Sequence, residues 1–340
     1  MRILIRKFRP AAIMAAALTL LLASSSLCAR ERAPELPANG QLPLEVRMGF
    51  NLINITDVSE KEETMDFEGA LYLEWRDPHL APEDAAGQNG GSRIYQGAFK
   101  VNEVFPGWRP HVVIPNGIGD RVSSNVAIRS WPDGRVQYSE IFFAKVETPM
   151  DLRRFPFDTQ ELEIYFHPFG YQNDELLLVP DHDLARSWGR NVGIAEWSQE
   201  SVSVRGETES IAYFDDVTGT ISAVVATVEI RRKPLHVVLT ILLPMVVLVA
   251  LTWCVFWMDA ETLSNRVSIT FIGILSVVTY YFVVFESLPE IDYLTFMDGF
   301  ILATFLILAA GVVVAVLIET TSKEEGRETD PRINRICRWA

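Results

Sequence analysis

The last third of the 340-residue chain holds three long apolar segments in close succession, and this feature restricts the possible folds more than any other. The segments span residues 235–258, 263–285 and 294–318, with short connections between them. A helix needs roughly 20 apolar residues to cross a bilayer, and each segment is about that long. Consecutive helices with short connections are antiparallel neighbours. We therefore predict a bundle of three membrane-spanning helices.

The middle segment carries no charge between Arg266 and Glu286, yet it is not uniformly apolar. It contains Ser268, Ile272, Leu275, Thr279 and Phe282, at spacings of four, three, four and three residues. These spacings place the five residues on one helical face. A helix that lines a narrow water path would have such a mixed face. A packed helix whose small polar residues contact its neighbours would have one too. The spacing alone leaves both alternatives open.

The start of the chain has the features of a secretory signal peptide. Residues 1–29 combine a basic beginning, an apolar core and small residues after it. Such a signal would place residues 30–233 outside the cytoplasmic membrane, and residues 234–320 would then cross it. Basic residues follow the third apolar segment, and they favour the cytoplasmic side. We expect a multi-pass protein of the inner (plasma) membrane whose residues 321–340 form a cytoplasmic tail.

The region between the signal and the first apolar segment has the pattern of a β-sandwich. Roughly ten stretches alternate apolar and polar residues between about residues 41 and 233, and turn signals separate them. Residues 131–135, Trp-Pro-Asp-Gly-Arg, predict a hairpin turn. Trp75, Trp108 and Trp131 are expected in the core, because scattered aromatic residues of a sandwich are more often buried than functional.

Several classes of function are disfavoured by composition. The net charge of −14 argues against a nucleic-acid partner. The three cysteines are placed too differently to form disulfides or a zinc site. The five histidines show no metal-ligand spacing, and the Gly-x-Ser-x-Gly motif of many hydrolases does not occur. We expect no enzyme, no cofactor and no metal site.

Several motifs together resemble a known family, the pentameric ligand-gated ion channels of the Cys-loop receptor superfamily. In chain order they are Trp75-Arg76-Asp77, Trp108-Arg109-Pro110, Trp131-Pro132-Asp133-Gly134, Phe155-Pro156-Phe157-Asp158, Arg231-Arg232-Lys233-Pro234-Leu235 with Pro244, and Leu288-Pro289. Thr148 and Leu162 stand where other members carry the cysteines that flank the signature loop. The chain therefore looks most like the bacterial, disulfide-free members, especially the amine-gated type.

The resemblance implies a homopentamer embedded in membrane lipid, with ligand sites between neighbouring sandwiches and the second helix around a central pore. Cyclic symmetry would turn the helical face described above into rings, with Ile272 and Leu275 as gate, Phe282 as outer and Ser268 as inner constriction. Ion selectivity would depend on Glu261, Asn265 and Glu286. The acidic net charge favours cations, although Asn265 stands where cation channels of the family carry an acid.

The resemblance also implies a ligand site and a coupling region. The implied ligand-binding residues are His167, Phe169, Tyr171 and Tyr213, with Tyr138 from the neighbouring subunit. The implied coupling residues, which would link ligand binding to the pore, are Phe155, Pro156, Phe157, Asp158, Arg232, Leu288 and Pro289. An ion pair between Arg232 and either Asp158 or an acid of the 59–66 loop is expected. Where the amine-gated pattern has two acids and an aromatic residue, this chain has His167, Val113 and Ile221. The agonist is therefore left open among amines, acids, neutral molecules, protons and divalent ions.

Two further alternatives follow from the sequence. The family has a fourth membrane helix, and residues 332–340 resemble only the approach to it. The fourth helix is therefore either truncated or naturally missing. A membrane-anchored periplasmic ligand-binding or sensor protein without channel activity is the main alternative function.

Overall fold

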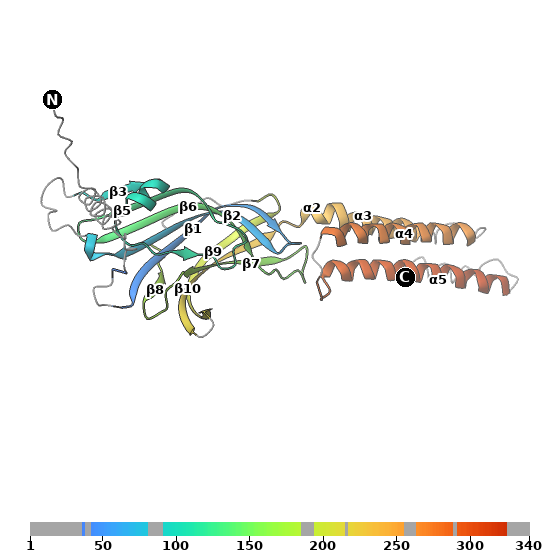
Figure 1. Ribbon diagram of the computed structural model, residues 1–340. Coiled ribbons are helices and arrows are strands. Elements are labelled where there is room, and N and C mark those ends of the chain that lie inside the picture. Colours follow the sequence, from blue (N-terminus) through green and yellow to red (C-terminus); the bar gives the residue numbers. More distant parts are fainter. Residues whose placement is uncertain are drawn as a thin grey trace, which may run out of the picture.

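Strands form one end of the molecule and helices the other (Figure 1). The computed structural model describes residues 36–37, 42–80, 91–184, 194–214, 217–254, 263–287 and 291–324. The predicted signal peptide at 1–29 lies outside these residues. The strands are β1 (Leu44–Ser59), β2 (Thr64–Arg76), β3 (Arg93–Gln96), β4 (Val112–Val113), β5 (Val122–Ser130), β6 (Arg135–Glu147), β7 (Thr159–Pro168), β8 (Leu176–Pro180), β9 (Trp197–Phe214) and β10 (Val217–Arg232). Short η1 (Pro78–Leu80) and η2 (Lys100–Val104) interrupt them.

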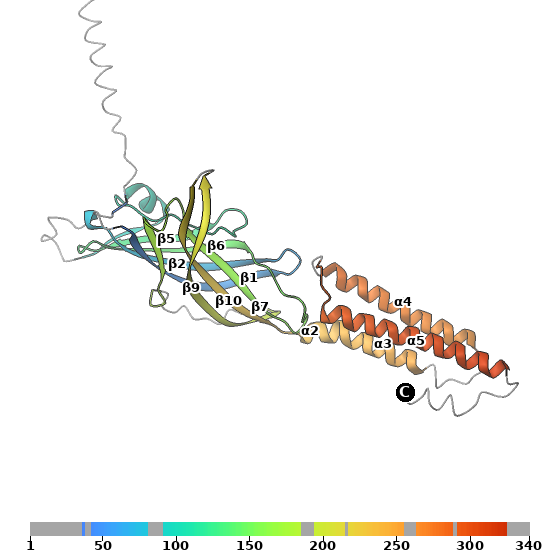
Figure 2. The ribbon, with the colours of Figure 1, turned by 90° about the horizontal axis from the view of Figure 1, so that it is seen from below.

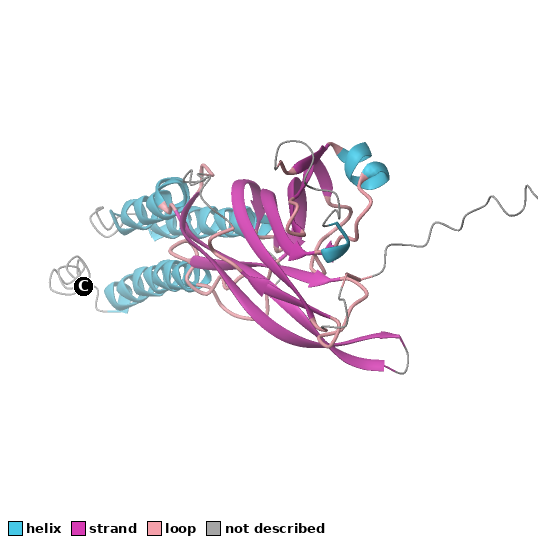
Figure 3. Ribbon diagram, turned by 90° about the vertical axis from the view of Figure 1, so that its left-hand side faces the viewer, coloured by secondary structure: helices cyan, strands magenta, loops and turns pink. Residues whose placement is uncertain are grey.

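The strands form two sheets that pack face to face (Figure 3). One sheet has the order β3-β5-β6-β2-β1-β8 and the other the order β4-β7-β10-β9. Neighbouring strands are antiparallel except for the parallel pair β1–β8. Alternate residues point inward, so Phe50 of β1 meets Phe166 of β7 across the interior at 5.2 Å between ring centroids. The predicted sandwich is therefore confirmed.

The hairpin between β5 and β6 forms where the sequence predicts it. The Gly134 N–H donates to the Trp131 carbonyl at 3.1 Å, and Gly134 has φ +80°, which a residue with a side chain rarely adopts. Trp75 and Trp108 are buried, as expected. The expectation for Trp131 is wrong: it is half-buried, with the guanidinium groups of Arg129 and Arg135 at 5.0 and 4.1 Å from its ring. At the tip of a hairpin only the two flanking strands can cover it.

Three helical rods leave the end of the sandwich near the tip of the 148–158 loop and lie side by side (Figures 1 and 2). The first consists of α2 (Leu235–Val237), the π-helical η3 (Val238–Leu242) and α3 (Leu243–Trp253). The π turn immediately precedes Pro244, whose missing N–H leaves a carbonyl of the preceding turn without its usual donor. The second rod is α4 (Leu263–Ser287) and the third is α5 (Phe296–Glu324).

Among the described residues, Leu235–Trp253 and Phe296–Val314 are long and apolar enough to cross a membrane, and Val267–Phe282 is a shorter apolar stretch. The third helix begins at Phe296 rather than at 294 and continues to Glu324, into the segment that the sequence assigned to the tail. Its first turn is closed by Thr295 and Asp298, whose side chains accept hydrogen bonds from each other's backbone N–H at 3.0 and 3.1 Å. Such a capping box defines a helix start.

Candidate pore, ligand wall and domain interface

One face of α4 is exposed in the single chain, and it carries all five residues with the predicted spacing. The exposed fractions of Ile272, Leu275 and Phe282 are 65%, 67% and 63%, and Ser268 and Thr279 are exposed too. The opposite face is buried, with Thr270 and Val277 only 3% and 1% exposed. A helix that places large apolar residues toward solvent on one side and packs on the other leaves a face for other molecules to cover.

Two hydroxyl groups of α4 donate to the backbone of their own helix. The Thr279 hydroxyl donates to the Leu275 carbonyl at 2.9 Å, and the Ser276 hydroxyl donates to the Ile272 carbonyl at 2.9 Å. Because the hydrogen of Thr279 points into the backbone, its oxygen lone pairs are the groups left to face outward. Such an oxygen can accept a hydrogen bond from water or contact a cation.

The predicted selectivity residues are located at or beyond the ends of α4. Glu261 lies outside the described residues. Asn265 and Glu286 belong to the first and last turns of α4, and their side chains lie outside the described part of the structure.

The end of β7 and the turn that follows it carry three of the predicted ligand residues, and each of them contacts a different partner. His167 ends up 3% exposed, with its Nε2 3.4 Å from Glu209 Oε1 on β9 and without a hydrogen-bond partner. Phe169 is 51% exposed, and its ring meets His111 at 5.5 Å. The Tyr171 hydroxyl accepts a hydrogen bond from Trp108 Nε1 at 2.9 Å. Tyr213 lies in β9, and its side chain is outside the described part.

We call His167, Phe169, Tyr171 and the residues that contact them the ligand wall. Two of these residues, His111 and Glu209, were missed by the sequence analysis. His111 directly follows the Trp108-Arg109-Pro110 motif, so its position next to the motif is the signal that could have found it. Glu209 carries no comparable signal, because only the pairing of β9 with β10 brings it over His167.

Both histidines of the wall favour the neutral form. Burial lowers the pKa of His167, while the Glu209 carboxylate acts in the opposite direction. Burial also lowers the pKa of His111, and the positive charges of Arg121 and Arg109 lower it further, against the pull of Glu140. Protonation of either histidine at lower pH therefore adds a positive charge that burial disfavours, and that the nearby arginines also disfavour at His111.

Tyr138 lies on the other sheet, away from these three residues. Its hydroxyl donates to Glu140 Oε2 at 3.0 Å, and Arg121 Nη2 lies 3.2 Å from the same carboxylate. Ser123 donates to the other carboxylate oxygen. Burial and Glu140 raise the pKa of Tyr138, so the phenol stays protonated. Within one chain Tyr138 belongs to a polar cluster around the buried Glu140 of β6.

Arg232 is the last residue of β10 and stands three positions before the first helix, at the end of the sandwich. Its Nε and Nη2 donate to the two Asp158 oxygens at 2.8 and 3.3 Å, and its Nη1 donates to Glu60 at 2.6 Å. The guanidinium also lies 4.0 Å from the Trp197 ring and 4.8 Å from the Phe155 ring. The structure thus contains the expected ion pair with both candidate partners.

The charge of Arg232 is retained despite its burial. The side chain is 4% exposed, and burial by itself would lower its pKa. The hydrogen bonds and charges of Asp158 and Glu60 outweigh this and raise the pKa above its ordinary value. Because a buried charge is stable only when paired, Arg232 holds the β1–β2 loop, the signature loop and the start of the first helix together.

The signature loop also contacts the third helix. Phe157, 52% exposed, meets Phe296 edge to face at 5.7 Å, and the Phe296 N–H donates to the Arg153 carbonyl at 2.8 Å. Phe155 is buried, and the Phe155–Pro156 peptide bond is cis. Leu288 and Pro289, the other predicted coupling residues, lie outside the described residues.

Comparison with protein-family models agrees with this architecture. Residues 26–234 match the neurotransmitter-gated ion-channel ligand binding domain, and residues 241–338 match the neurotransmitter-gated ion-channel transmembrane region. The chain belongs to the neurotransmitter-gated ion-channel family. Its fold, a ligand-binding sandwich followed by transmembrane helices, and its place in the membrane are those of the family, which confirms the resemblance drawn from the motifs.

Curated members of the neurotransmitter-gated ion-channel family are similar over most of the chain. A proton-gated ion channel of Gloeobacter violaceus is 26% identical over 97% of this chain and 88% of its own length. The human gamma-aminobutyric acid receptor subunit rho-3 is 24% identical over 89% of this chain, and the mouse subunit rho-2 is 25% identical over 85%. The chain spans less than two thirds of these receptor subunits, 63% and 61%. The amine-gated subtype stays a prediction.

Proposed function

We propose that five copies of this chain form a ligand-gated channel that passes monovalent cations through a pore lined by α4. The exposed, regularly spaced face of Ile272, Leu275 and Phe282 carries this proposal, because a pore supplies the water and the identical neighbours that such a face lacks in one chain. Assembly into a pentamer is supported by the family of the chain.

The apolar rings act as the gate in this proposal. A narrow ring of leucine or isoleucine side chains loses its water and blocks ions without closing mechanically. Opening requires Ile272 and Leu275 to move outward. Thr279 and Ser268 then supply hydroxyl oxygens along the open path, and the outward lone pairs of Thr279 suit cations better than anions.

We propose the wall at His167, Phe169, Tyr171 and Tyr213 as the ligand site, closed by Tyr138 of a neighbouring subunit, and protons as a ligand. Because the pKa of His167 is lowered, the conformation described above keeps its full stability above pH 6.5, the ordinary pKa of histidine. It loses stability as the pH falls below that value. A conformation in which His167 is accessible therefore gains population on acidification. The similarity to a channel described as proton-gated supports the same ligand.

Recording from liposomes that contain the purified chain tests this function. Steps from neutral to acidic external pH are expected to evoke a cation current, and His167→Gln is expected to shift its half-activation to lower pH. His182→Gln, a change at an exposed histidine, is the matched control. A wild-type chain that forms no pentamer on crosslinking and conducts with none of protons, amines, acids or calcium would instead indicate a membrane-anchored sensor.

A further inference from the structure

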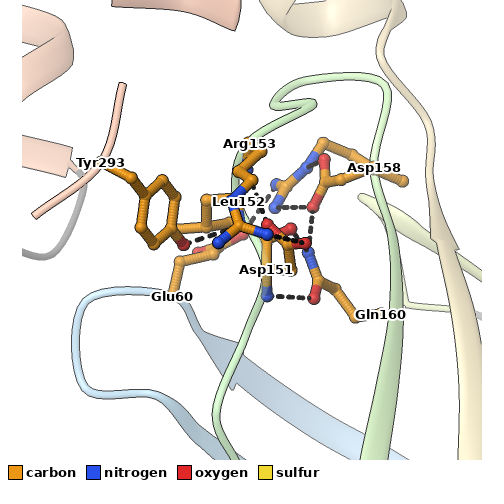
Figure 4. Close-up of polar contacts among 8 residues, drawn as sticks. Glu60, Asp151, Leu152, Arg153, Asp158, Gln160 and Tyr293 are labelled. Carbon is orange, nitrogen blue, oxygen red and sulfur yellow. Dashed lines mark hydrogen bonds and ion pairs between the residues drawn. The ribbon is translucent and has the colours of Figure 1, made fainter. Parts of the chain in front are cut away.

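The loop segment Met150–Arg153 is held from two sides by side chains of two different domains (Figure 4). On one side lies Gln160 of β7, only 2% exposed. On the other lies Tyr293, in the short stretch before α5. Neither residue belongs to the set of coupling residues that the sequence predicts. The gating role argued for them below rests on the proposed channel function.

Gln160 binds the segment as a neighbouring strand would. Its Oε1 accepts from the Asp151 N–H at 2.9 Å, and its Nε2 donates to the Asp151 carbonyl at 2.8 Å. The same Nε2 donates to Asp158 Oδ2 at 2.6 Å. Because Asp158 is the partner of Arg232, the amide of Gln160 connects the buried ion pair directly to the backbone of the loop.

Tyr293 binds the residues on either side of Asp151. Its hydroxyl accepts from the Leu152 N–H at 3.1 Å and donates to the Met150 carbonyl at 3.3 Å. Alternate residues of a strand present their backbone groups to opposite sides, so the bonds to Gln160 and to Tyr293 use all four groups without competition. Leu152 is fully buried, which limits the access of water to its backbone N–H.

We propose that Gln160 and Tyr293 are positioning residues for gating, which transmit displacement of the Arg232–Asp158 pair through the Asp151–Leu152 backbone to α5. The path is a continuous series of hydrogen bonds from Arg232 of β10 to Tyr293, three positions before Phe296. The Phe296–Arg153 bond adds a second contact at the end of the path. Such a path can move α5 when the sandwich moves, because its bonds at Asp158 are buried and the others are partly shielded from water.

A matched control exists within the sandwich. The Ser222 hydroxyl accepts from the Leu178 N–H at 2.7 Å and donates to the Leu176 carbonyl at 3.3 Å. It therefore makes the same two bonds to the same backbone pattern as the Tyr293 hydroxyl, but wholly inside one domain. Tyr293→Phe and Ser222→Ala each remove one hydroxyl and orphan one buried N–H.

The first test is a double-mutant cycle on proton-evoked currents in liposomes. Tyr293→Phe removes two hydrogen bonds and Gln160→Ala removes three. Each is expected to shift the half-activating proton concentration by about tenfold or more, and the double variant is expected to shift it no further. Ser222→Ala is expected to lower thermal stability as much as Tyr293→Phe while leaving the half-activating concentration unchanged. Additive shifts of Tyr293→Phe and Gln160→Ala, or an equal shift for Ser222→Ala, would overturn the proposal.

The second test needs no current and separates this proposal from the proposed function. In hydrogen exchange of the purified full chain, Gln160→Ala is expected to speed exchange at 291–297, and Tyr293→Phe at 151–160. Ser222→Ala is expected to change neither segment. Cross-domain changes in a chain without current would contradict the channel and support the path. Changes confined to each variant's own domain would overturn the path even in a conducting channel.

Discussion

Arg232 differs from its neighbour Arg231 in almost every physical respect, although the two residues are adjacent and identical in type. The side chain of Arg231 is 62% exposed and lies 3.7 Å from Glu200, whereas that of Arg232 is 4% exposed and shared between two carboxylates. Successive residues of a strand point to opposite faces, so a strand that ends at the membrane surface sends one arginine to solvent and one into the domain interface.

Arg232→Ala is expected to destabilise the protein by about 3–5 kcal/mol, because it leaves the buried Asp158 and the half-buried Glu60 without a counter-charge. Arg231→Ala is expected to cost less than about 1 kcal/mol, as for an exposed ion pair. Thermal unfolding of the solubilised protein measures both. Similar melting temperatures for the two variants would show that the buried pair contributes little.

At the scale of elements, α4 has two faces with opposite requirements. The face that is buried within the chain packs closely on α3: a Cβ added at Gly273 would lie 2.6 Å from Thr252 Oγ1. The opposite face, which is exposed in the single chain, carries the predicted pore residues. The close approach at Gly273 sets the orientation of the helix, and it thereby sets which residues face outward.

Gly273→Ala is expected to destabilise the helix bundle by about 1–3 kcal/mol through overpacking. Gly299→Ala on α5, where an added Cβ meets nothing within 4 Å, is the control and is expected to be neutral or to stabilise by up to about 1 kcal/mol. Thr252→Ala combined with Gly273→Ala should recover most of the loss. Melting temperatures that show no recovery would indicate that Thr252 is not the cause.

Leu275→Ser is expected to make the channel open more easily, because a hydroxyl in the apolar ring keeps the constriction wet. Leu306→Ser, at a leucine of α5 that is 58% exposed, is the control for the same chemical change outside the ring. The proton concentration for half-maximal current is the measurement. An unchanged or reduced sensitivity for Leu275→Ser would remove Leu275 from the gate.

At the scale of the whole molecule, charge and architecture act together. The full chain has a net charge of −14. An excess of carboxylates raises the concentration of cations near a protein surface. We predict that Glu261 and Glu286, near the two ends of α4 in sequence, act on the ions that enter or leave the proposed pore.

Reversal potentials in a sodium chloride gradient are expected to lie near the sodium equilibrium potential. Glu261→Gln and Glu286→Gln are expected to move them toward the chloride value, because each removes a ring of five charges. Glu45→Gln, an exposed acid in β1, serves as control and should leave the potential in place. A wild-type potential near the chloride value would contradict cation selectivity.

Local patterns in the sequence determined the class of the fold. Two-residue alternation predicted the sandwich, long apolar runs predicted three helices, and the four-three spacing predicted the face of α4 that the structure leaves exposed. These succeed because each depends on periodicity within one element. The motifs around Phe155 and Arg232 identified the region where the domains meet, and the resemblance supplied the ion pair.

Tertiary structure alone decided which distant groups meet. Gln160 and Tyr293 are 133 positions apart and share no motif, yet between them they bind three consecutive residues of the loop. Strand pairing likewise brings Glu209 over His167, and exposure at a hairpin tip leaves Trp131 half-buried. Periodicity and motifs report the environment that a residue's neighbours in sequence create, whereas these contacts depend on how sheets and helices pack, which is settled only when the whole chain has folded.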